Sequence, residues 1–344
     1  MTRPTLAVTM GDPAGIGPEI TLKTLLNEEI YDICVPLVIG DMESLRKTAS
    51  MLRADPGVLR VIEDPSQAKG AFGVVDVIDL KLLNKDGWKI GEVSKVSGNA
   101  AFRYVKTAID LALSGKVDAV VTAPINKEAL SLAGHPFPGH TEIFAHYCGT
   151  EDYAMVLAAG NLRVIHVTTH VSLRDACESI SEDSVLRTIK LAKEALESIG
   201  VTGRIAVAGL NPHSSEHGIF GDEEEHSIIP AIKTAVSQGI DAEGPVPADT
   251  VFVKALAGNY AMVVAMYHDQ GHIPVKIAGF KADKKTGVMT QTGGVNFTVG
   301  LPVIRTSVDH GTAFEIADKY VADASSMIEA ITMASEMVSN RKPS

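Results

Sequence analysis

Tyr260-Ala-Met-Val-Val-Ala265 is a short apolar run, and Met266-Tyr-His-Asp-Gln-Gly-His-Ile-Pro-Val-Lys276 follows it directly. The apolar run predicts a buried strand. Imidazoles and a carboxylate at the end of such a strand need polar partners, which favours the carboxyl edge of an α/β sheet, where ligands bind. His268 and Asp269 are candidate metal ligands there, and Lys276 is a candidate anion contact. The alternative is a polar loop with a capping aspartate.

The rest of the chain repeats this alternation of apolar strands and helices, which predicts an α/β fold with a largely parallel sheet covered on both faces. The expected buried strands are residues 5–10, 35–40, 117–124, 153–159, 162–167 and 204–209. The first of them runs into Gly11-Asp-Pro-Ala-Gly-Ile-Gly-Pro-Glu19 and a helix, a layout that suits anion binding. It matches neither GxGxxG nor the P-loop pattern, so glycines that serve packing are the alternative.

Composition limits the class of protein. The chain has 344 residues, 45% of them hydrophobic and 21% charged, which is typical of a globular protein with one large or two smaller domains. The net charge of -11 argues against nucleic acid and anionic membranes as partners. Thr2-Arg3-Pro4 leads straight into a strand, no apolar run approaches the ~20 residues of a membrane span, and the three cysteines form no CxxC. We therefore expect a cytoplasmic protein with reduced thiols.

Three histidines share one position in this pattern. His170, His213 and His268 each come just after an apolar strand. Strand ends converge on one edge of such a sheet, so the three imidazoles could form an open metal site with positions left for substrate. Each of them taken alone is more often a structural, hydrogen-bonded histidine.

Further polar residues follow other strands and turns. Asn296 and Arg305 flank a strand-like run, and the loop His310-Gly-Thr-Ala313 enters a helix. Gly311 would let a ligand approach the backbone closely, and Thr312 could cap the helix. His140 and Thr141 precede another helix, where capping is the simpler interpretation of Thr141.

These motifs together resemble the 4-hydroxythreonine-4-phosphate dehydrogenase (PdxA) family. The matching stretches, in order along nearly the whole chain, are Gly11–Glu19, Val121–Lys127, Gly139-His-Thr-Glu142, Thr168-Thr-His170, Gly209-Leu-Asn-Pro-His213, Pro247-Ala-Asp-Thr250, Tyr267-His-Asp-Gln-Gly271 and Arg305–Ala313. The Gly-Ile-Gly-Pro-Glu turn and the His-Gly-Thr-Ala loop also resemble, more distantly, isocitrate and isopropylmalate dehydrogenases.

The resemblance implies a fold of two α/β domains of the isocitrate and isopropylmalate dehydrogenase type with the active-site cleft between them. Residues 1–128 plus 300–344 would form the first domain, and 129–299 the second, which carries the metal-ligand histidines. The resemblance also implies a homodimer with its active site at the interface. A nicotinamide cofactor would be held without a GxGxxG turn.

The resemblance further implies a role for individual residues. The metal ligands would be His170, His213 and His268; the substrate-binding residues His140, Thr141, Lys276, Asn296 and Arg305; and the cofactor-binding residues His310, Gly311, Thr312 and Ala313. Lys276, Asp249 and Asp269 are the catalytic candidates. The sequence does not choose between Asp249 and Asp269 as acid/base, and either could instead orient a ligand imidazole.

The implied reaction is oxidation, with decarboxylation, of a small 4-phosphorylated hydroxy acid by NAD, or NADP, with one divalent metal (Zn, Mg, Co or Mn). 4-Hydroxythreonine 4-phosphate, a precursor in pyridoxal phosphate biosynthesis, is the first choice of substrate. Gly-His-Ile-Pro-Val-Lys276 also resembles the family's second branch, which oxidises D-threonate or D-erythronate 4-phosphate. The segment Gly279–Thr292 looks longer than in the family pattern and could reshape the substrate pocket.

Three other readings stay open on the sequence alone. One is a cis-dihydrodiol carboxylate dehydrogenase, which would act on an unphosphorylated relative of the substrate. The second is an NAD-independent metallohydrolase or lyase that uses the three histidines. The third is a non-catalytic metabolite-binding protein on the same scaffold.

Overall fold

A computed structural model describes residues 3–83, 87–282 and 289–341. By its contacts the chain divides into two compact units, Met1–Glu151 with Leu301–Arg341, and Asp152–Gly300. The domains expected from the sequence divide after residue 128 instead. The difference arises because helices α5 (Lys127–Leu132) and α6 (His140–Cys148) pack against α4 (Lys95–Leu113) in the first unit.

The first unit contains parallel strands in the order β3-β4-β2-β1-β5-β14. Their bounds are Leu59–Val61, Val75–Asp79, Val35–Gly40, Thr5–Thr9, Ala119–Thr122 and Ile304–Val308. In β1, Leu6, Ala7, Val8 and Thr9 are all buried. Because successive strand residues point to opposite faces, a run of buried residues means that both faces are covered.

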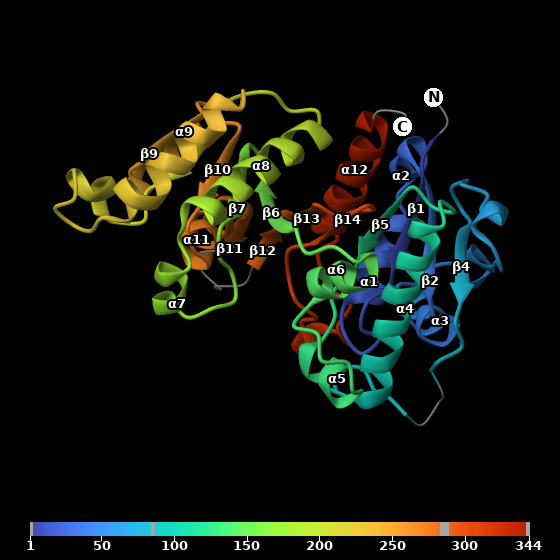
Figure 1. The fold of residues 1–344 in the computed structure, drawn as a ribbon. Coiled ribbons are helices and arrows are strands. Elements are labelled where there is room, and N and C mark those ends of the chain that lie inside the picture. The colour runs from blue at the N-terminus through green and yellow to red at the C-terminus, as the bar shows by residue number, and fades with distance from the viewer. Residues whose placement is uncertain (1–2, 84–86, 283–288, 342–344) are drawn as a thin grey trace. The chain divides into compact units, whose positions relative to one another are not determined.

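Helices provide that cover (Figure 1). The remaining helices of this unit are α1 (Gly17–Leu25), α2 (Glu29–Ile33), α3 (Met42–Met51) and α12 (Ser325–Asn340). Helix α4 packs on β1, β2 and β5, and α12 packs on β14 and β5. Side chains cap several of these helices: the hydroxyl of Ser94 accepts from the Ser97 amide at the start of α4, and the Asn126 side chain accepts from the Ala129 amide at the start of α5.

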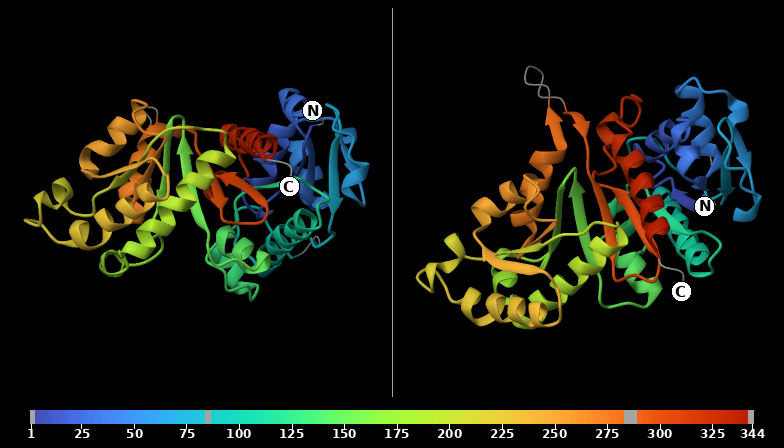
Figure 2. Two further views of the ribbon diagram at one scale, coloured as in Figure 1. Left: turned by 45° about the horizontal axis from the view of Figure 1, so that its top comes forward. Right: turned by 90° about the horizontal axis from the view of Figure 1, so that it is seen from above.

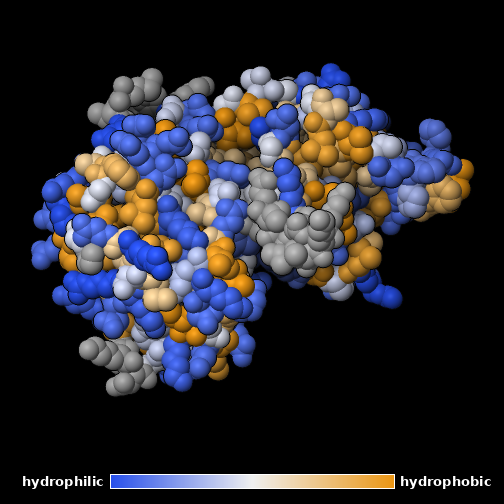
Figure 3. Space-filling view, turned by 180° about the vertical axis from the view of Figure 1, so that it is seen from behind, coloured by the Kyte–Doolittle hydropathy of each residue, from blue (hydrophilic) through white to orange (hydrophobic). Residues whose placement is uncertain are grey.

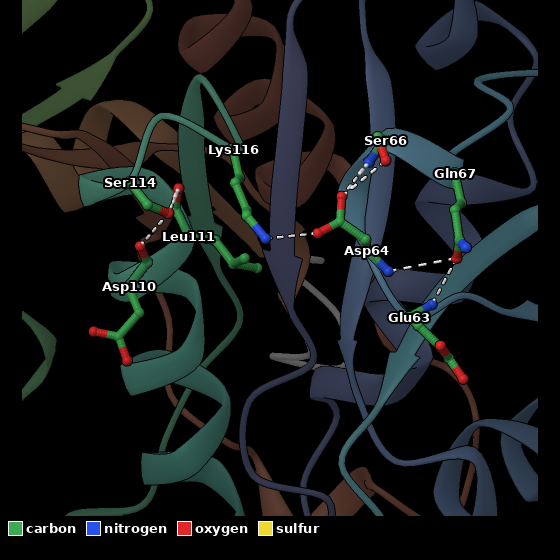
Figure 4. A network of polar contacts seen from close by, with 8 residues as sticks. All are labelled: Glu63, Asp64, Ser66, Gln67, Asp110, Leu111, Ser114 and Lys116. Carbon is green, nitrogen blue, oxygen red and sulfur yellow. Dashed lines mark hydrogen bonds and ion pairs between the residues drawn. The ribbon is translucent and has the colours of Figure 1, made fainter.

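A surface network ties the C-terminal end of α4 to the turn that follows β3 (Figure 4). The Lys116 ammonium lies 2.7 Å from the Asp64 carboxylate, which also accepts from the amide and hydroxyl of Ser66. Gln67 completes a capping box with Asp64. The hydrogen bond from Lys116 is the largest cause that lowers the pKa of Asp64 to about 2. Because the pair is exposed to solvent, its main effect is on local geometry.

The second unit contains strands in the order β13-β6-β7-β10-β8-β9. Their bounds are Val295–Val299, Ala154–Ala159, Leu162–His166, Met262–Ala265, Ile205–Ala208 and Ala242–Val246. Strands β7, β10, β8 and β9 are parallel, whereas β6 pairs antiparallel with both neighbours. The mostly parallel α/β sheet expected from the sequence is therefore confirmed.

Helices also flank the strands of the second unit (Figure 2). They are α7 (Leu173–Glu178), α8 (Glu182–Ser198), α9 (Ile229–Ser237), α10 (Ala248–Leu256) and α11 (His268–Gly279). Side chains of α10 and α11, among them Phe252 and Val275, share one core with Val164 of β7 and Val263 of β10. Helix α11 begins at His268, so the stretch after the apolar run is a helix and not a loop.

The long segment Gly279–Thr292 lies partly outside the described residues. Its described ends, β11 (Phe280–Ala282) and β12 (Met289–Thr292), pair antiparallel as a small two-stranded sheet.

Three features expected from the composition can be compared with the structure: the polarity of the surface, the apolarity of the helices and the state of the cysteines. On the face drawn in Figure 3, hydrophilic residues surround smaller hydrophobic areas. None of the helices in residues 3–83, 87–282 and 289–341 combines the length and apolarity needed to cross a bilayer. Cys34, Cys148 and Cys177 are free thiols.

Candidate active site

A pocket of about 190 Å³ opens at the carboxyl ends of β5 and β14 in the first unit. Both strands run in the same direction, so the loops that follow them meet at one edge. This pocket is lined by the ends of β5 and β14, the loops that follow them, and the starts of α5 and α6: Thr122, Pro124, Ile125, Lys127, Gly139, His140, Ser307, Val308, His310 and Gly311. The structure thus brings His140, expected at the substrate, together with His310 and Gly311, expected at the cofactor.

Arg305 supplies a buried cation next to this pocket. The side chain comes from β14, and only 2% of its surface is exposed. Its guanidinium donates to the Thr122 hydroxyl at 3.0 Å and to the Thr141 hydroxyl at 3.5 Å, and it lies 5.7 Å from the Phe144 ring. Burial lowers the pKa of Arg305 to about 9, which leaves the group charged at neutral pH. A desolvated cation of this kind binds an anion more strongly than a surface one.

His140 and Thr141 begin α6, immediately after Gly139. Neither caps the helix through its side chain, because the N-cap is Gly139 and no side-chain cap is present. The capping interpretation of Thr141 is therefore wrong. The His140 Nε2 atom is buried and has no hydrogen-bond partner among the described residues. Burial, and then the positive charge of Arg305, hold the pKa of His140 well below its usual value.

This shift predicts a loss of stability in acid. The folded chain keeps His140 neutral, whereas the unfolded chain binds a proton there once the pH falls below about 6.5. The unfolded state then binds more protons, so the free energy of unfolding falls as the pH is lowered from 7.5 to 5.5. Urea unfolding at several pH values measures this slope. His140→Leu should make it shallower; an unchanged slope would show that His140 does not contribute.

The glycine-rich turn Gly11–Glu19 packs against the backbone of the loops that border this pocket. Gly11 has a φ of +71°, and a Cβ there would lie 2.3 Å from the Pro124 carbonyl oxygen. A Cβ on Gly15 would lie 2.7 Å from the Thr312 carbonyl oxygen, which accepts a hydrogen bond from the Ile16 amide. These close approaches favour packing as the role of the glycines.

The loop His310–Ala313 is thereby held against the turn. Ala313 has a left-handed φ of +43° and precedes the short helix Phe314–Ile316. Thr312 therefore contacts the turn through its backbone. In contrast, a Cβ on Gly311 would meet nothing within 4 Å, so the space beside this backbone is open toward the pocket.

A second pocket, of about 270 Å³, lies at the carboxyl ends of β7 and β10 in the second unit. It is lined by Thr169, His170, Val171, Leu173, Ala176, Tyr267, His268 and Asp269. The rings of His170 and His268 lie 5.7 Å apart, centroid to centroid. The Nδ1–H of His268 donates to the Asp269 carboxylate at 2.7 Å, so Asp269 orients this imidazole.

His213 does not join these two histidines in a three-ligand site. Among the described residues, no group of three or more histidine, cysteine or acidic side chains is arranged to hold a metal ion. The loop His213–His217 has five consecutive residues with positive φ, and the His213 Nδ1–H donates to the Glu216 carboxylate at 2.7 Å. The donor types suit a divalent metal, but the geometry does not assemble them.

The remaining predicted residues lie at separate points of the second unit. Asp249 is exposed in the first turn of α10, and its charge helps to raise the pKa of His213, after the larger effect of Glu216. Lys276 is half-buried on α11, and its ammonium lies 4.5 Å from the centre of the Phe280 ring. The Asn296 amide on β13 contacts the Met155 sulfur at 2.7 Å, and its Oδ1 is buried without a partner among the described residues.

Sequence reasoning missed one residue of the first pocket and two histidines that lie next to His268 of the second pocket. Lys127 lines the first pocket, although only its motif had been noted. His166 and His272 lie beside His268 in the second unit. Burial lowers the pKa of His272 to about 4, and burial likewise lowers that of His166. The signal for His272 was its spacing of four residues from His268 on one helix, whereas His166 reads as an ordinary strand residue.

Known proteins resemble this chain over nearly its whole length. Residues 32–334 match the family model described as pyridoxal phosphate biosynthetic protein PdxA. The chain is 48% identical to D-threonate 4-phosphate dehydrogenase of Cupriavidus necator, over 98% of each chain. It is 47% identical to the enzyme of that name from Salmonella typhimurium, over 98% of this chain and all of the other.

A solved structure is similar to this chain over nearly its whole length. The crystal structure of a 4-hydroxythreonine-4-phosphate dehydrogenase from Burkholderia phymatum has a TM-score of 0.82 and 47% identity, covering 98% of this chain and 99% of the other. The mixed α/β fold, the two pockets at the strand ends and these relatives together show that the chain belongs to the PdxA family.

Proposed function

We propose that this protein oxidises D-threonate 4-phosphate at the hydroxyl beta to the carboxylate, with NAD as the acceptor, and that carbon dioxide is then lost. The observation that carries the proposal is the 48% identity, over 98% of each chain, to a D-threonate 4-phosphate dehydrogenase. This order reverses the sequence-based preference for 4-hydroxythreonine 4-phosphate. That substrate is the second candidate, favoured by the likeness to the Burkholderia phymatum structure.

Recognition of the phosphate or carboxylate of an anionic substrate is assigned to the first pocket. Arg305, with Thr141 and His140 beside it, provides a buried cation and neutral donors for a phosphate or carboxylate. Lys127 lines the same pocket. Lys276 and Asn296 of the second unit are further proposed substrate-binding residues, since Lys276 carries a positive charge and the buried Asn296 Oδ1 has no partner among the described residues.

The cofactor is assigned to the loop His310–Ala313. The open space beside Gly311 suits close approach of a ligand to the backbone, and His310 shares the pocket with His140. NAD, or NADP, would supply the hydride acceptor when bound. Since the loop is fastened to the glycine-rich turn through Thr312, its backbone is already ordered for binding.

The proton of the oxidised hydroxyl needs a base. Asp269 holds the His268 imidazole at 2.7 Å, which makes it an orienting residue. Lys276 and Asp249 then remain as the acid/base candidates. Loss of carbon dioxide follows readily from the oxidised product because it is a β-keto acid.

We also propose dependence on one divalent metal (Zn, Mg, Co or Mn) with His170, His213 and His268 as ligands. In support, His170 and His268 already share a pocket, and His213 lies on an exposed loop. The His213 Nδ1–H donates to Glu216, so Nε2 is the atom through which His213 would bind the metal.

The assembly belongs to the same proposal: a homodimer of two-domain chains of the isocitrate dehydrogenase type. Helix α11 offers an apolar strip for association, since Ile273 and Ile277 are one turn apart and 56% and 75% exposed.

The test is the production of NADH by the purified protein. D-Threonate 4-phosphate, D-erythronate 4-phosphate, 4-hydroxythreonine 4-phosphate and a cis-dihydrodiol carboxylate are each offered with NAD or NADP, with and without chelator and added metal. We expect turnover of D-threonate 4-phosphate that chelator abolishes and metal restores. Light scattering on the same preparation should give the mass of a dimer.

Other outcomes have definite meanings. Faster turnover of another substrate would reassign the branch, and turnover that survives chelation would remove the metal. If metal binds but neither NAD nor NADP is reduced with any substrate, the dehydrogenase proposal is wrong. A metallohydrolase or lyase, or a non-catalytic binding protein, would then take its place.

A further inference from the structure

Two histidines next to His268 have no role in the reaction described above. His272 lies one helical turn after His268 on α11, and the two rings stack with centroids 3.6 Å apart and an interplanar angle of 10°. His166 is the last residue of β7, and only 4% of its surface is exposed. Its Nε2 atom lies 3.2 Å from the His272 Nδ1 atom.

The contacts place His272 in a defined orientation. Its Nδ1 atom lies 3.1 Å from the His268 carbonyl oxygen, which can only accept a hydrogen bond. We therefore assign the proton to Nδ1 of His272, and this N–H is shared between the carbonyl oxygen and His166 Nε2. His166 Nε2 is then the acceptor. The ring of His272 is held at one edge by both contacts, and its face lies on His268.

The backbone is built to allow this contact. Gly271 lies between the pocket residues and His272, and a Cβ there would lie 2.3 Å from His166 Nε2. Only glycine lets α11 approach β7 closely enough for the two imidazoles to meet. His166 Nδ1 has no hydrogen-bond partner among the described residues, so burying this imidazole costs free energy that an apolar side chain would avoid.

We propose that His272, held in place by His166, is a positioning residue that fixes the plane of the His268 imidazole. Asp269 holds the Nδ1 edge of that ring, and His272 supports its face. Together these two contacts hold the His268 ring in one orientation. Its Nε2 atom therefore keeps a fixed direction for the proposed binding of metal in the second pocket. The catalytic consequence rests on the proposed function, but the positioning itself is a property of the chain alone.

The first measurement is independent of activity. Ring-proton chemical shifts of His268 are recorded by NMR on the metal-free protein with labelled histidines. In the wild type, stacking on His272 should shift these protons upfield. His166→Leu leaves the His272 ring present but removes its tether, so the His268 signals should move toward the positions found in His272→Leu.

The second measurement is steady-state kinetics with D-threonate 4-phosphate and NAD. Loss of a residue that orients a functional imidazole typically costs about 10- to 100-fold. We expect His272→Leu to lower kcat by such a factor and to leave KM for NAD unchanged. His272→Phe, which keeps a stacking ring, and His166→Leu should give smaller losses. The double variant of His166 and His272 should lower kcat no further than His272→Leu alone, because His166 acts only by holding His272 in place.

His135→Leu is the matched control. The His135 ring stacks on Phe102 at 3.7 Å, and its Nε2 lies 3.2 Å from the Asn99 side-chain oxygen, so the same kind of contact is lost in the first unit. This variant should leave the His268 signals and kcat at wild-type values.

The inference is overturned if His166→Leu leaves the His268 signals unmoved, or if His272→Leu folds and retains full kcat. If His272→Leu does not fold, His166→Leu and His272→Phe decide the question. If the wild type shows no dehydrogenase activity, the proposed function fails, while the NMR comparison still tests the positioning.

Discussion

Replacing Arg305 with leucine is expected to lower kcat/KM for D-threonate 4-phosphate by roughly 30- to 4,000-fold. Removing one partner of a buried charged contact costs about 2–5 kcal/mol, and each 1.4 kcal/mol is about a factor of ten. The burial of Arg305 to 2% exposure places it in this class and not with surface cations. The loss should appear in KM for the phosphorylated acid and leave KM for NAD unaffected.

Two further variants sharpen this prediction. Arg305→Lys keeps the positive charge but cannot reach both Thr122 and Thr141 in the geometry of a guanidinium, so it should recover only part of the activity. Arg204→Leu removes an exposed arginine that pairs with Asp241 and Glu243, and it should have no effect on kcat/KM. If Arg305→Leu, correctly folded by circular dichroism, retains the wild-type KM, Arg305 does not bind the substrate.

Substitution of Gly11 by alanine should produce the largest loss of stability. Gly11 combines a φ of +71° with a would-be Cβ only 2.3 Å from the Pro124 carbonyl oxygen. The left-handed conformation costs an alanine about 1–2 kcal/mol, and overpacking adds about 1–3 kcal/mol. We therefore expect the free energy of unfolding of the first unit to fall by roughly 2–5 kcal/mol, measured by urea denaturation.

Gly115→Ala separates the two contributions. Gly115 has a φ of +68°, but a Cβ there would meet nothing within 4 Å. This variant should lose only the conformational part, about 1–2 kcal/mol. Equal losses in the two variants would show that the contact between the glycine-rich turn and the loop after β5 contributes nothing.

The glycine-rich turn also shows where sequence reasoning stopped. The sequence offered two interpretations of Gly15 and Gly17, anion binding or packing. The choice depends on where other backbone atoms lie in space, namely the Thr312 carbonyl from a distant segment for Gly15 and the Met10 carbonyl at the end of β1 for Gly17. Spacing along the chain contains no information about these approaches.

The amino-acid sequence by itself determined the α/β class and the residues at the strand ends. Short apolar runs that stop at polar residues indicate burial, because burying an unpaired imidazole or carboxylate inside a sheet costs free energy. His170 and His268 were found in this way, and they do share a pocket. The motifs that resemble the PdxA family were likewise visible in order along the chain.

The tertiary structure alone decided the environment of each side chain. His213 follows its strand as His170 does, but its orientation is set by the left-handed loop and by the hydrogen bond to Glu216. His140 and Arg305, 165 positions apart, influence each other only because α6 and β14 meet. His166 and His272 contact each other because Gly271 permits it. Local patterns fix which groups reach an edge of the sheet, whereas the partners that set charge and orientation come from distant segments.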